Sequence, residues 1–303
     1  MIPRGYLYVF GCASSFGIIT TLAKITYDEG ASPPTVVFFR LLAGSILMGI
    51  MSAWSHRKNL LSGKSKPESS NTWRLRVLII VTGISIAVMS LGYLGSVKYI
   101  PVSLSVLLFF TFPFWVLLLN YFIDGEVPER LKLIAFVIAF FGLALTLGPT
   151  WQVLDWRGIA LVLAGALGSA GMIIGGAKSV QLISMSNLVF FSNTVGAVLV
   201  GIILLLTDTF SLSQTPLGWA GIASICVLFV LGQLSLFAAT RHIGSAQTSI
   251  MLNLEPFISI GAAMLLLGER LQLSQSLGVL VVISALFMAS GLTRKFSKSS
   301  KNE

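Results

Sequence analysis

One acidic side chain lies in the middle of a long apolar stretch, where an ionised group is costly. Glu255 is ten residues into the run Ser245–Leu267 and is followed directly by Pro256. A charge at the centre of a membrane helix costs about 2.5–3.5 kcal/mol, and such acids usually face a cavity or a partner. Pro256 has no N–H to donate, so it loosens a turn and exposes carbonyl groups nearby. The pair predicts a site for solute binding or proton coupling. A protonated Glu255 that braces the proline kink is the structural alternative.

Two cationic side chains also lie within apolar runs. Lys24 precedes Asp28 by four residues, a spacing that allows an ion pair on a helix. Its long side chain can also extend to the headgroups, so a structural role is favoured for Lys24. Arg40 lies deeper, and the two interpretations are evenly balanced there. If both face a cavity, they favour a solute with a carboxylate or another anionic group.

Neutral polar side chains complete the set of candidate solute ligands. Those deep in apolar runs are Tyr93, Asn193, Gln233 and Asn253. A stripe at three- and four-residue spacing in the run Arg74–Val97 contains Ser85, Met89, Gly92, Tyr93 and Ser96. Hydrogen bonds between packed membrane helices are the alternative for all of them. Small residues crowd the run Gly158–Ala177 and predict close helix packing.

The elements that must position these residues are membrane helices. Of the 303 residues, 55% are hydrophobic and 10% are charged, against about 25% charged in a soluble domain. A bilayer core needs helices of about 20 apolar residues. Ten runs approach that length: Gly5–Tyr27, Thr35–Trp54, Arg74–Val97, Pro101–Ile123, Leu131–Gly148, Gly158–Ala177, Asn187–Thr207, Leu217–Thr240, Ser245–Leu267 and Gln272–Leu292. The sequence therefore predicts an all-α membrane protein with ten transmembrane helices.

The distribution of Lys and Arg predicts the orientation in the membrane. With the N-terminus inside, the inner loops and termini carry 15 Lys and Arg residues and the outer loops carry three. Cytoplasmic loops are the ones enriched in Lys and Arg. Both termini are therefore expected on the cytoplasmic side of the inner membrane. The net charge of +9 lies in these short loops, not along a helix face, which argues against nucleic-acid binding.

The two halves of the chain repeat each other. A shift of 143 residues places Pro113 on Pro256 and Gly125-Glu126 on Gly268-Glu269. Each half, 1–148 and 149–303, has five predicted helices, so the second copy enters the membrane in the opposite direction. Inverted repeats are typical of transporters, whose solute site lies near the midplane between the halves.

These motifs resemble the EamA-type repeat of the drug/metabolite transporter superfamily. The resemblance rests on the mid-helix Pro113 and Pro256, each followed by an exit Gly-Glu, on Glu255-Pro256-Phe257, and on Ala23-Lys24 with Phe39-Arg40. Two departures are Phe16-Gly17, where Trp-Gly is commoner, and Phe112, opposite Glu255 of the second repeat. The resemblance implies secondary transport, often export, of amino acids or other small metabolites across the cytoplasmic membrane. Glu255 would allow protons to act as the coupling ion, whereas facilitated exchange needs no coupling acid.

Catalytic motifs are absent from the sequence. There is no HExxH, no Walker loop and no GxSxG, and His56, His242, Cys12 and Cys226 do not gather at one predicted depth. The sequence thus predicts no enzyme, metal or cofactor. The alternative to transport is a membrane scaffold or receptor subunit that shares the fold.

Overall fold

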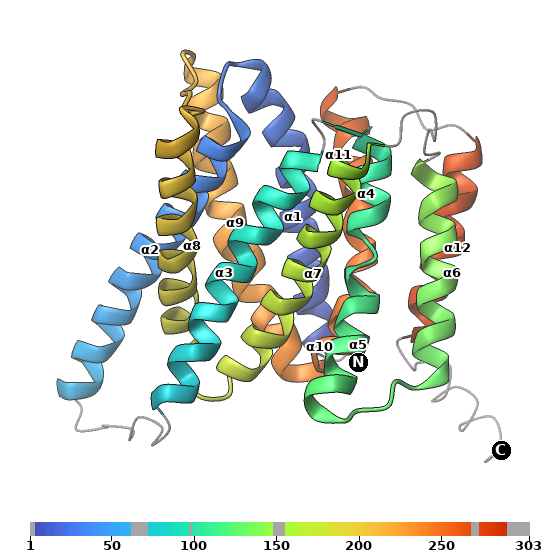
Figure 1. The fold of residues 1–303 in the computed structure, drawn as a ribbon, viewed down its shortest axis with the longest axis horizontal. Helices are drawn as coiled ribbons and strands as arrows, with labels where there is room; N and C mark the ends of the chain where they lie inside the picture. Colours follow the sequence, from blue (N-terminus) through green and yellow to red (C-terminus); the bar gives the residue numbers. More distant parts are fainter. Residues whose placement is uncertain are drawn as a thin grey trace.

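The computed structural model describes residues 4–61, 72–96, 99–100, 102–147, 155–267 and 273–289, and the regular elements among them are all helices (Figure 1). In chain order they are α1 (Arg4–Asp28), α2 (Pro33–Leu61), α3 (Thr72–Ser96), α4 (Val102–Phe109), α5 (Phe112–Asp124), α6 (Arg130–Leu147), α7 (Trp156–Ser179), α8 (Met185–Thr207), α9 (Pro216–Ile243), α10 (Ser245–Met251), the 3-10 turn η1 (Leu252–Leu254), α11 (Glu255–Leu267) and α12 (Leu273–Ala289). The protein is an all-helical bundle.

Polar residues at the helix ends explain several of these boundaries. Asp155 accepts a hydrogen bond from the backbone N–H of Arg157 at the start of α7. Thr215 does the same for Gly218 at the start of α9, directly before Pro216. These side chains satisfy backbone donors that the first turn leaves free. At the end of α5 the chain turns at Gly125, whose positive φ of 69° suits glycine.

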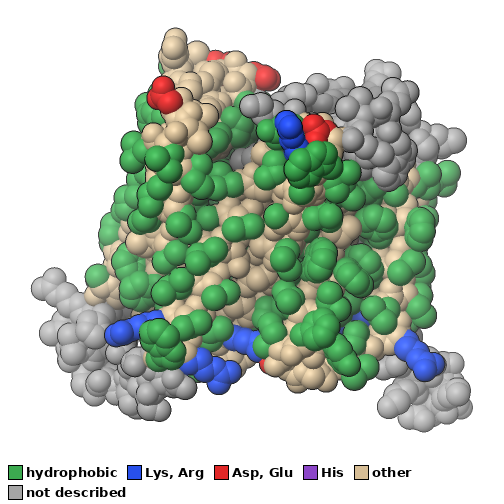
Figure 2. Space-filling view, viewed as in Figure 1, with side chains coloured by type: hydrophobic (Ala, Val, Ile, Leu, Met, Phe, Trp, Pro, Cys, Tyr) green, Lys and Arg blue, Asp and Glu red, His purple; other side chains and the backbone are tan. Residues whose placement is uncertain are grey.

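The bundle has the surface of a membrane protein. Seven stretches are long and apolar enough to cross a bilayer: α1, α2, α3, α4 with α5, α7, α8 and α9. Large apolar side chains face outward, and Leu205, Leu265 and Phe122 are 87%, 88% and 72% exposed. Figure 2 shows such side chains over the whole middle of the molecule. Exposure of an apolar surface of this extent to water is unfavourable, so lipid must cover it.

Apart from Arg40 and Glu255, the described charged residues lie near the two ends of the bundle. We call one end basic because its described cations are Arg4, Arg74, Arg76, Arg130, Lys132, Lys178 and Arg241 (lower edge of Figure 2). We call the other end acidic because its described ions are Asp28, Glu29, Asp155, Arg157 and Asp208. The positions along the helices follow from the chain order, in which successive helices run in opposite directions.

Helix contacts repeat when the two halves are exchanged. The helices α1, α2, α3, α4–α5 and α6 correspond in order to α7, α8, α9, α10–α11 and α12. The contact of α1 with α9 then corresponds to that of α7 with α3, and α2 with α9 to α8 with α3. The pairs α2–α8 and α6–α12 correspond to themselves. Because corresponding helices run in opposite directions through the bundle, the two halves pack as an inverted pair.

Both halves contain a helix that is interrupted at the same place. The break between α4 and α5 precedes Pro113, and η1 precedes Pro256. A proline ring clashes with the carbonyl four residues earlier. Those residues are Phe109, the last of α4, and Leu252, the first of η1. From the sequence we expected two continuous helices, each loosened at its proline. In the structure, each of these helices is divided into two segments.

Glycines let α3 and α7 pack backbone to backbone. A Cβ atom at Gly92 would lie 2.6 Å from the carbonyl oxygen of Leu161, and one at Gly168 would lie 2.7 Å from the nitrogen of Met89. Ser85 packs on Gly171 in the same seam. The small residues of α7 are therefore packing residues, as predicted. The α3 stripe is not a free lining, because Ser85, Met89 and Gly92 face α7.

Candidate functional site

Arg40 lies inside the bundle and contacts two other helices. It is seven residues from the start of α2 at the acidic end, which is about 10 Å along the helix axis. Its Nη2 donates a hydrogen bond to Ser90 Oγ of α3 at 2.8 Å. Its guanidinium carbon lies 4.6 Å from the ring centroid of Phe229 of α9, within the range of a cation–π contact. The buried Nε of Arg40 has no hydrogen-bond partner among the residues that the structure describes.

Glu255 occupies the first position of α11, directly after the 3-10 turn. Its side chain is partly exposed and is close enough to Arg40 to interact with it electrostatically. Among the ion pairs of the described residues, Arg40 and Glu255 do not pair directly with each other. One acid and one base therefore lie near each other with their charges separated.

The pair Phe16-Gly17 supports both charged residues from α1. A Cβ atom at Gly17 would lie 2.9 Å from the carbonyl oxygen of Glu255, so only glycine allows α1 and α11 to approach this closely. The Phe16 ring lies 6.1 Å from the ring of Phe229, on which Arg40 stacks. Phe16-Gly17, which stands where Trp-Gly is commoner in the family repeat, thus lies at the centre of the candidate site.

Tyr93 extends the site with an aromatic wall. It lies three residues after Ser90, on the same side of α3. Its ring is 4.9 Å from that of Phe109, the residue at which α4 ends. Phe110 and Phe112 pack around Phe109 with centroid distances of 5.6 Å and 5.8 Å. The break before Pro113 is therefore filled by aromatic rings.

The three candidate amides already have protein partners. Asn193 and Gln233, both fully buried, donate to each other at 2.9 Å and 3.0 Å and join α8 to α9. Asn253 donates to the carbonyl of Ile250 at 2.9 Å within the interrupted helix. Their contact with a solute remains a prediction. The side chain of Lys24 lies outside the described residues, as do Gly268 and Glu269.

Sequence reasoning missed Ser90 and Phe229. A signal for Ser90 was present, because the shift of 143 residues places it on Gln233. The repeat thus has a polar contact at the same depth in both halves: Arg40 with Ser90 between α2 and α3, and Asn193 with Gln233 between α8 and α9. Phe229 carried no such signal, since an aromatic residue in an apolar helix is ordinary.

Two sets of helices enclose these residues. We call α1, α9 and α11 the first arm, and α3, α4, α5 and α7 the second arm, because the helices of each set pack on one another. Glu255 and Phe229 belong to the first arm, and Ser90 and Tyr93 to the second. Arg40 contacts a residue of each arm.

At the basic end the arms are joined. There α10 packs on α9 of the first arm and on α5 and α7 of the second, and Asn120 of α5 donates to Ser245 Oγ of α10 at 2.9 Å. Phe237 of α9 fills the space beside Gly176 of α7. An ion pair between Lys178 and Asp124 ties α7 to α5 beside them.

The corresponding helices at the acidic end are not joined in this way. Exchange of the halves turns α5–α10, α7–α10 and α7–α9 into α11–α4, α1–α4 and α1–α3. None of these three pairs makes a comparable contact across the described ranges, and α4 packs on α7 of its own arm. Within the described part of the chain, the two ends therefore differ, although the repeat would allow them to be alike.

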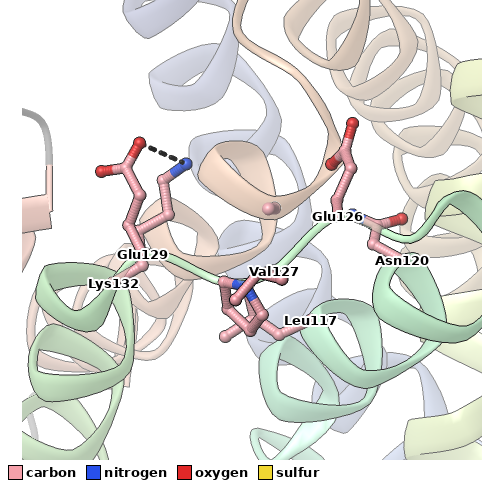
Figure 3. A pocket seen from close by; sticks show the side chains of 8 residues that line it. Leu117, Asn120, Glu126, Val127, Glu129 and Lys132 are labelled. Carbon is pink, nitrogen blue, oxygen red and sulfur yellow. Dashed lines mark ion pairs between the residues drawn. The ribbon is translucent and has the colours of Figure 1, made fainter.

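A shallow pocket lies at the basic end, away from Arg40 and Glu255. It has a volume of about 270 Å³ and lies between the end of α5, the link to α6, and Ala246 of α10. Figure 3 shows Glu126 and Asn120 on one side of it and the ion pair of Glu129 with Lys132, 3.7 Å apart, on the other. The described residues contain no group of three His, Cys, Asp or Glu side chains that could hold a metal ion.

Comparison with known proteins decides the family. The profile of the EamA-like transporter family matches residues 3–148 and again residues 156–291. The chain belongs to the EamA-like transporter family. A solved crystal structure of a protein is similar to this EamA-like chain over 97% of its length and 98% of the other chain, with a TM-score of 0.73 and 16% identity, which supports the fold. No curated protein matches the chain.

Proposed function

We propose that this EamA-like protein is a secondary transporter that carries small metabolites, such as amino acids, across the cytoplasmic membrane, in the direction of export. The observation that carries the proposal is the double family match combined with the unequal ends of the bundle. Two inverted repeats can form two conformations, each joined at one end. The arms would release the contacts at the basic end and form the corresponding contacts at the acidic end.

The proposed topology has ten membrane crossings, arranged as two inverted five-helix repeats of residues 1–148 and 149–303. Seven of the proposed crossings are the apolar stretches described above, and the other three are α6, the interrupted helix α10–α11 and α12. The basic end faces the cytoplasm, because Lys and Arg are retained on that side. The first and last described helices, α1 and α12, begin and end at that side of the bundle (Figure 1).

Glu255 is the proposed proton-coupling residue, and Arg40, Tyr93 and Phe229 surround the solute. The support is their position: Glu255 and Phe229 lie on the first arm, Tyr93 on the second, and Arg40 reaches both. A site between the arms can be exposed to each side in turn as the arms move.

Solute flux into proteoliposomes tests the proposal. The purified protein should move at least one labelled amino acid or related metabolite faster than empty liposomes, without nucleotide. A crosslinked control, described below, should abolish that flux. A folded protein that moves none of a broad metabolite set would favour the scaffold or receptor-subunit alternative.

A further inference from the structure

We propose that Arg40 binds a carboxylate of the transported solute and that Ser90 and Phe229 position its guanidinium for this contact. The inference rests on the proposed transport function and adds the class of solute: a small molecule with a single carboxylate group. It also assigns roles to two residues, Ser90 and Phe229, for which the sequence motifs give no role.

The first argument is that the charge of Arg40 is incompletely compensated. Its contacts are a neutral hydroxyl at 2.8 Å and an aromatic ring at 4.6 Å. Its Nε has no partner within the described part of the chain, and Glu255 does not pair with it directly. A cation at this depth is costly unless it is paired. A carboxylate suits a guanidinium because two parallel N–H donors match its two oxygens.

The second argument is that a solute can approach Arg40 from one side. Arg40 is partly exposed and lies about 10 Å from the acidic end of α2. At that end α4 does not pack on α1 or α11 in the described ranges, whereas α10 closes the basic end against α5 and α7. With the described helices arranged in this way, a solute that enters from the acidic end meets Arg40 before it meets the contacts that join the arms.

The third argument separates a carboxylate from a phosphate. Arginine binds both groups well. Glu255 lies within electrostatic range of Arg40, and a second acidic group near a carboxylate is disfavoured because like charges repel. A dianionic phosphate would increase that repulsion, while a single carboxylate matches the single positive charge of Arg40. A monocarboxylate is therefore the better fit.

Ser90 and Phe229 fix the direction of the guanidinium. The hydroxyl of Ser90 holds Nη2, and the ring of Phe229 holds the flat face. Together they leave the remaining N–H edge in one orientation, which lowers the entropy cost of binding. They lie on different arms, so motion of the arms changes the position of Arg40 relative to at least one of them.

The experiment compares matched pairs of probes on the full chain in lipid nanodiscs. The pairs are acetate with acetamide, benzoate with benzamide, alanine with alaninamide, and inorganic phosphate as a separate probe. Binding is measured by the rise in unfolding temperature and by calorimetry. At least one carboxylate should bind at least tenfold more tightly than its amide. That preference should be lost in Arg40→Gln and retained in Arg241→Gln, which removes an exposed cation at the basic end.

The two positioning residues, Ser90 and Phe229, are tested with separate variants. Ser90→Ala and Phe229→Leu should each weaken carboxylate affinity about 3- to 30-fold, in line with the loss of a charged hydrogen bond or a cation–π contact, and leave amide affinity unchanged. The conservative variants Ser90→Thr and Phe229→Tyr should retain the carboxylate affinity of the unmodified protein. A general loss of folding would not give this pattern. Ser192→Ala is the matched control, because the Ser192 hydroxyl donates within its own helix, to the carbonyl of Leu188.

Several outcomes would overturn the inference. These are equal binding of every carboxylate and its amide, stronger binding of phosphate, or a carboxylate preference that persists in Arg40→Gln. If Arg40→Gln does not fold, unchanged carboxylate affinity in both Ser90→Ala and Phe229→Leu would overturn it. Failure of transport is distinguishable: selective binding without flux in proteoliposomes would defeat the transport proposal alone, and flux indifferent to Arg40→Gln would defeat this inference alone.

Discussion

The buried amide pair of Asn193 and Gln233 allows a quantitative test of what holds α8 against α9. The perturbation is the set Asn193→Leu, Gln233→Met and the double variant, in which an apolar side chain of similar shape replaces each amide. Each single variant leaves one buried amide without its two partners, 2.9 Å and 3.0 Å away, which costs about 1–3 kcal/mol. The double variant removes both amides at once and should cost less than the sum of the singles.

The expected coupling energy follows from the number of bonds. Hydrogen bonds between side chains in membrane proteins contribute about 0.6 kcal/mol on average and about 1.7 kcal/mol at most. Two reciprocal bonds therefore predict a coupling of about 1–3 kcal/mol in the double-mutant cycle. The assay is reversible unfolding in mixed micelles, from which the free energy of unfolding is obtained for all four proteins.

The same variants test whether Gln233 contacts the solute. If its amide serves only the pair with Asn193, the double variant should retain solute flux once its stability is restored by lower temperature. A coupling energy near zero would show that the reciprocal bonds are not formed in the membrane. Flux lost in the double variant despite normal folding would return Gln233 to the solute site.

Three further changes test the proposed transport cycle. Glu255→Gln keeps the shape of the protonated acid but cannot release a proton, so it should fold normally and lose proton-driven accumulation and the pH dependence of flux. Both are measured in proteoliposomes with imposed pH gradients. An unchanged pH profile would show that Glu255 only braces the helix, with Arg40, Tyr93 and Cys12 as the neighbouring groups to examine. Asn120→Cys with Ser245→Cys should form a disulfide that holds the basic end closed, since Asn120 Nδ2 and Ser245 Oγ are 2.9 Å apart. The disulfide should lower flux at least tenfold until it is reduced. Full flux in the oxidised protein would refute motion at this end. In a variant without native cysteines, Ser65→Cys and Ser299→Cys should resist impermeant thiol reagents in intact cells, and ready labelling of either would reverse the proposed topology.

The sequence predicts the helices well because their signal is local. Composition and run length alone indicate an all-α membrane protein, and the 143-residue shift indicates the repeat. The two prolines mark where a helix is weakened, but not that the chain divides there into α4 and α5 or adopts the turn η1. That outcome depends on the aromatic packing around Phe109 and on the hydrogen bond of Asn253 to Ile250.

The candidate site is less predictable because its contacts are distant in sequence. Arg40 and Glu255 are recognisable as costly charges in apolar runs, whatever surrounds them. Their partners are not: Ser90 is 50 residues from Arg40, and Phe229 is on the other half of the repeat. Gln233 and Asn193 look like solute ligands in the sequence, because nothing in it indicates that each amide faces the other.

In the proposed transport cycle, the contact of Phe237 with Gly176 predicts that the two conformations differ in free energy. The shift of 143 residues places Leu94 on Phe237, and the shift of 154 residues that places Ala23-Lys24 on Ala177-Lys178 also places Leu22 on Gly176. In the proposed cycle, closure at the acidic end would bring together two leucines instead of a phenylalanine and a glycine, which predicts unequal resting populations of the two states. A difference of about 1.4 kcal/mol shifts their ratio tenfold. In an inverted repeat, small substitutions of this kind at opposite ends set which side the empty carrier faces while it waits for its solute.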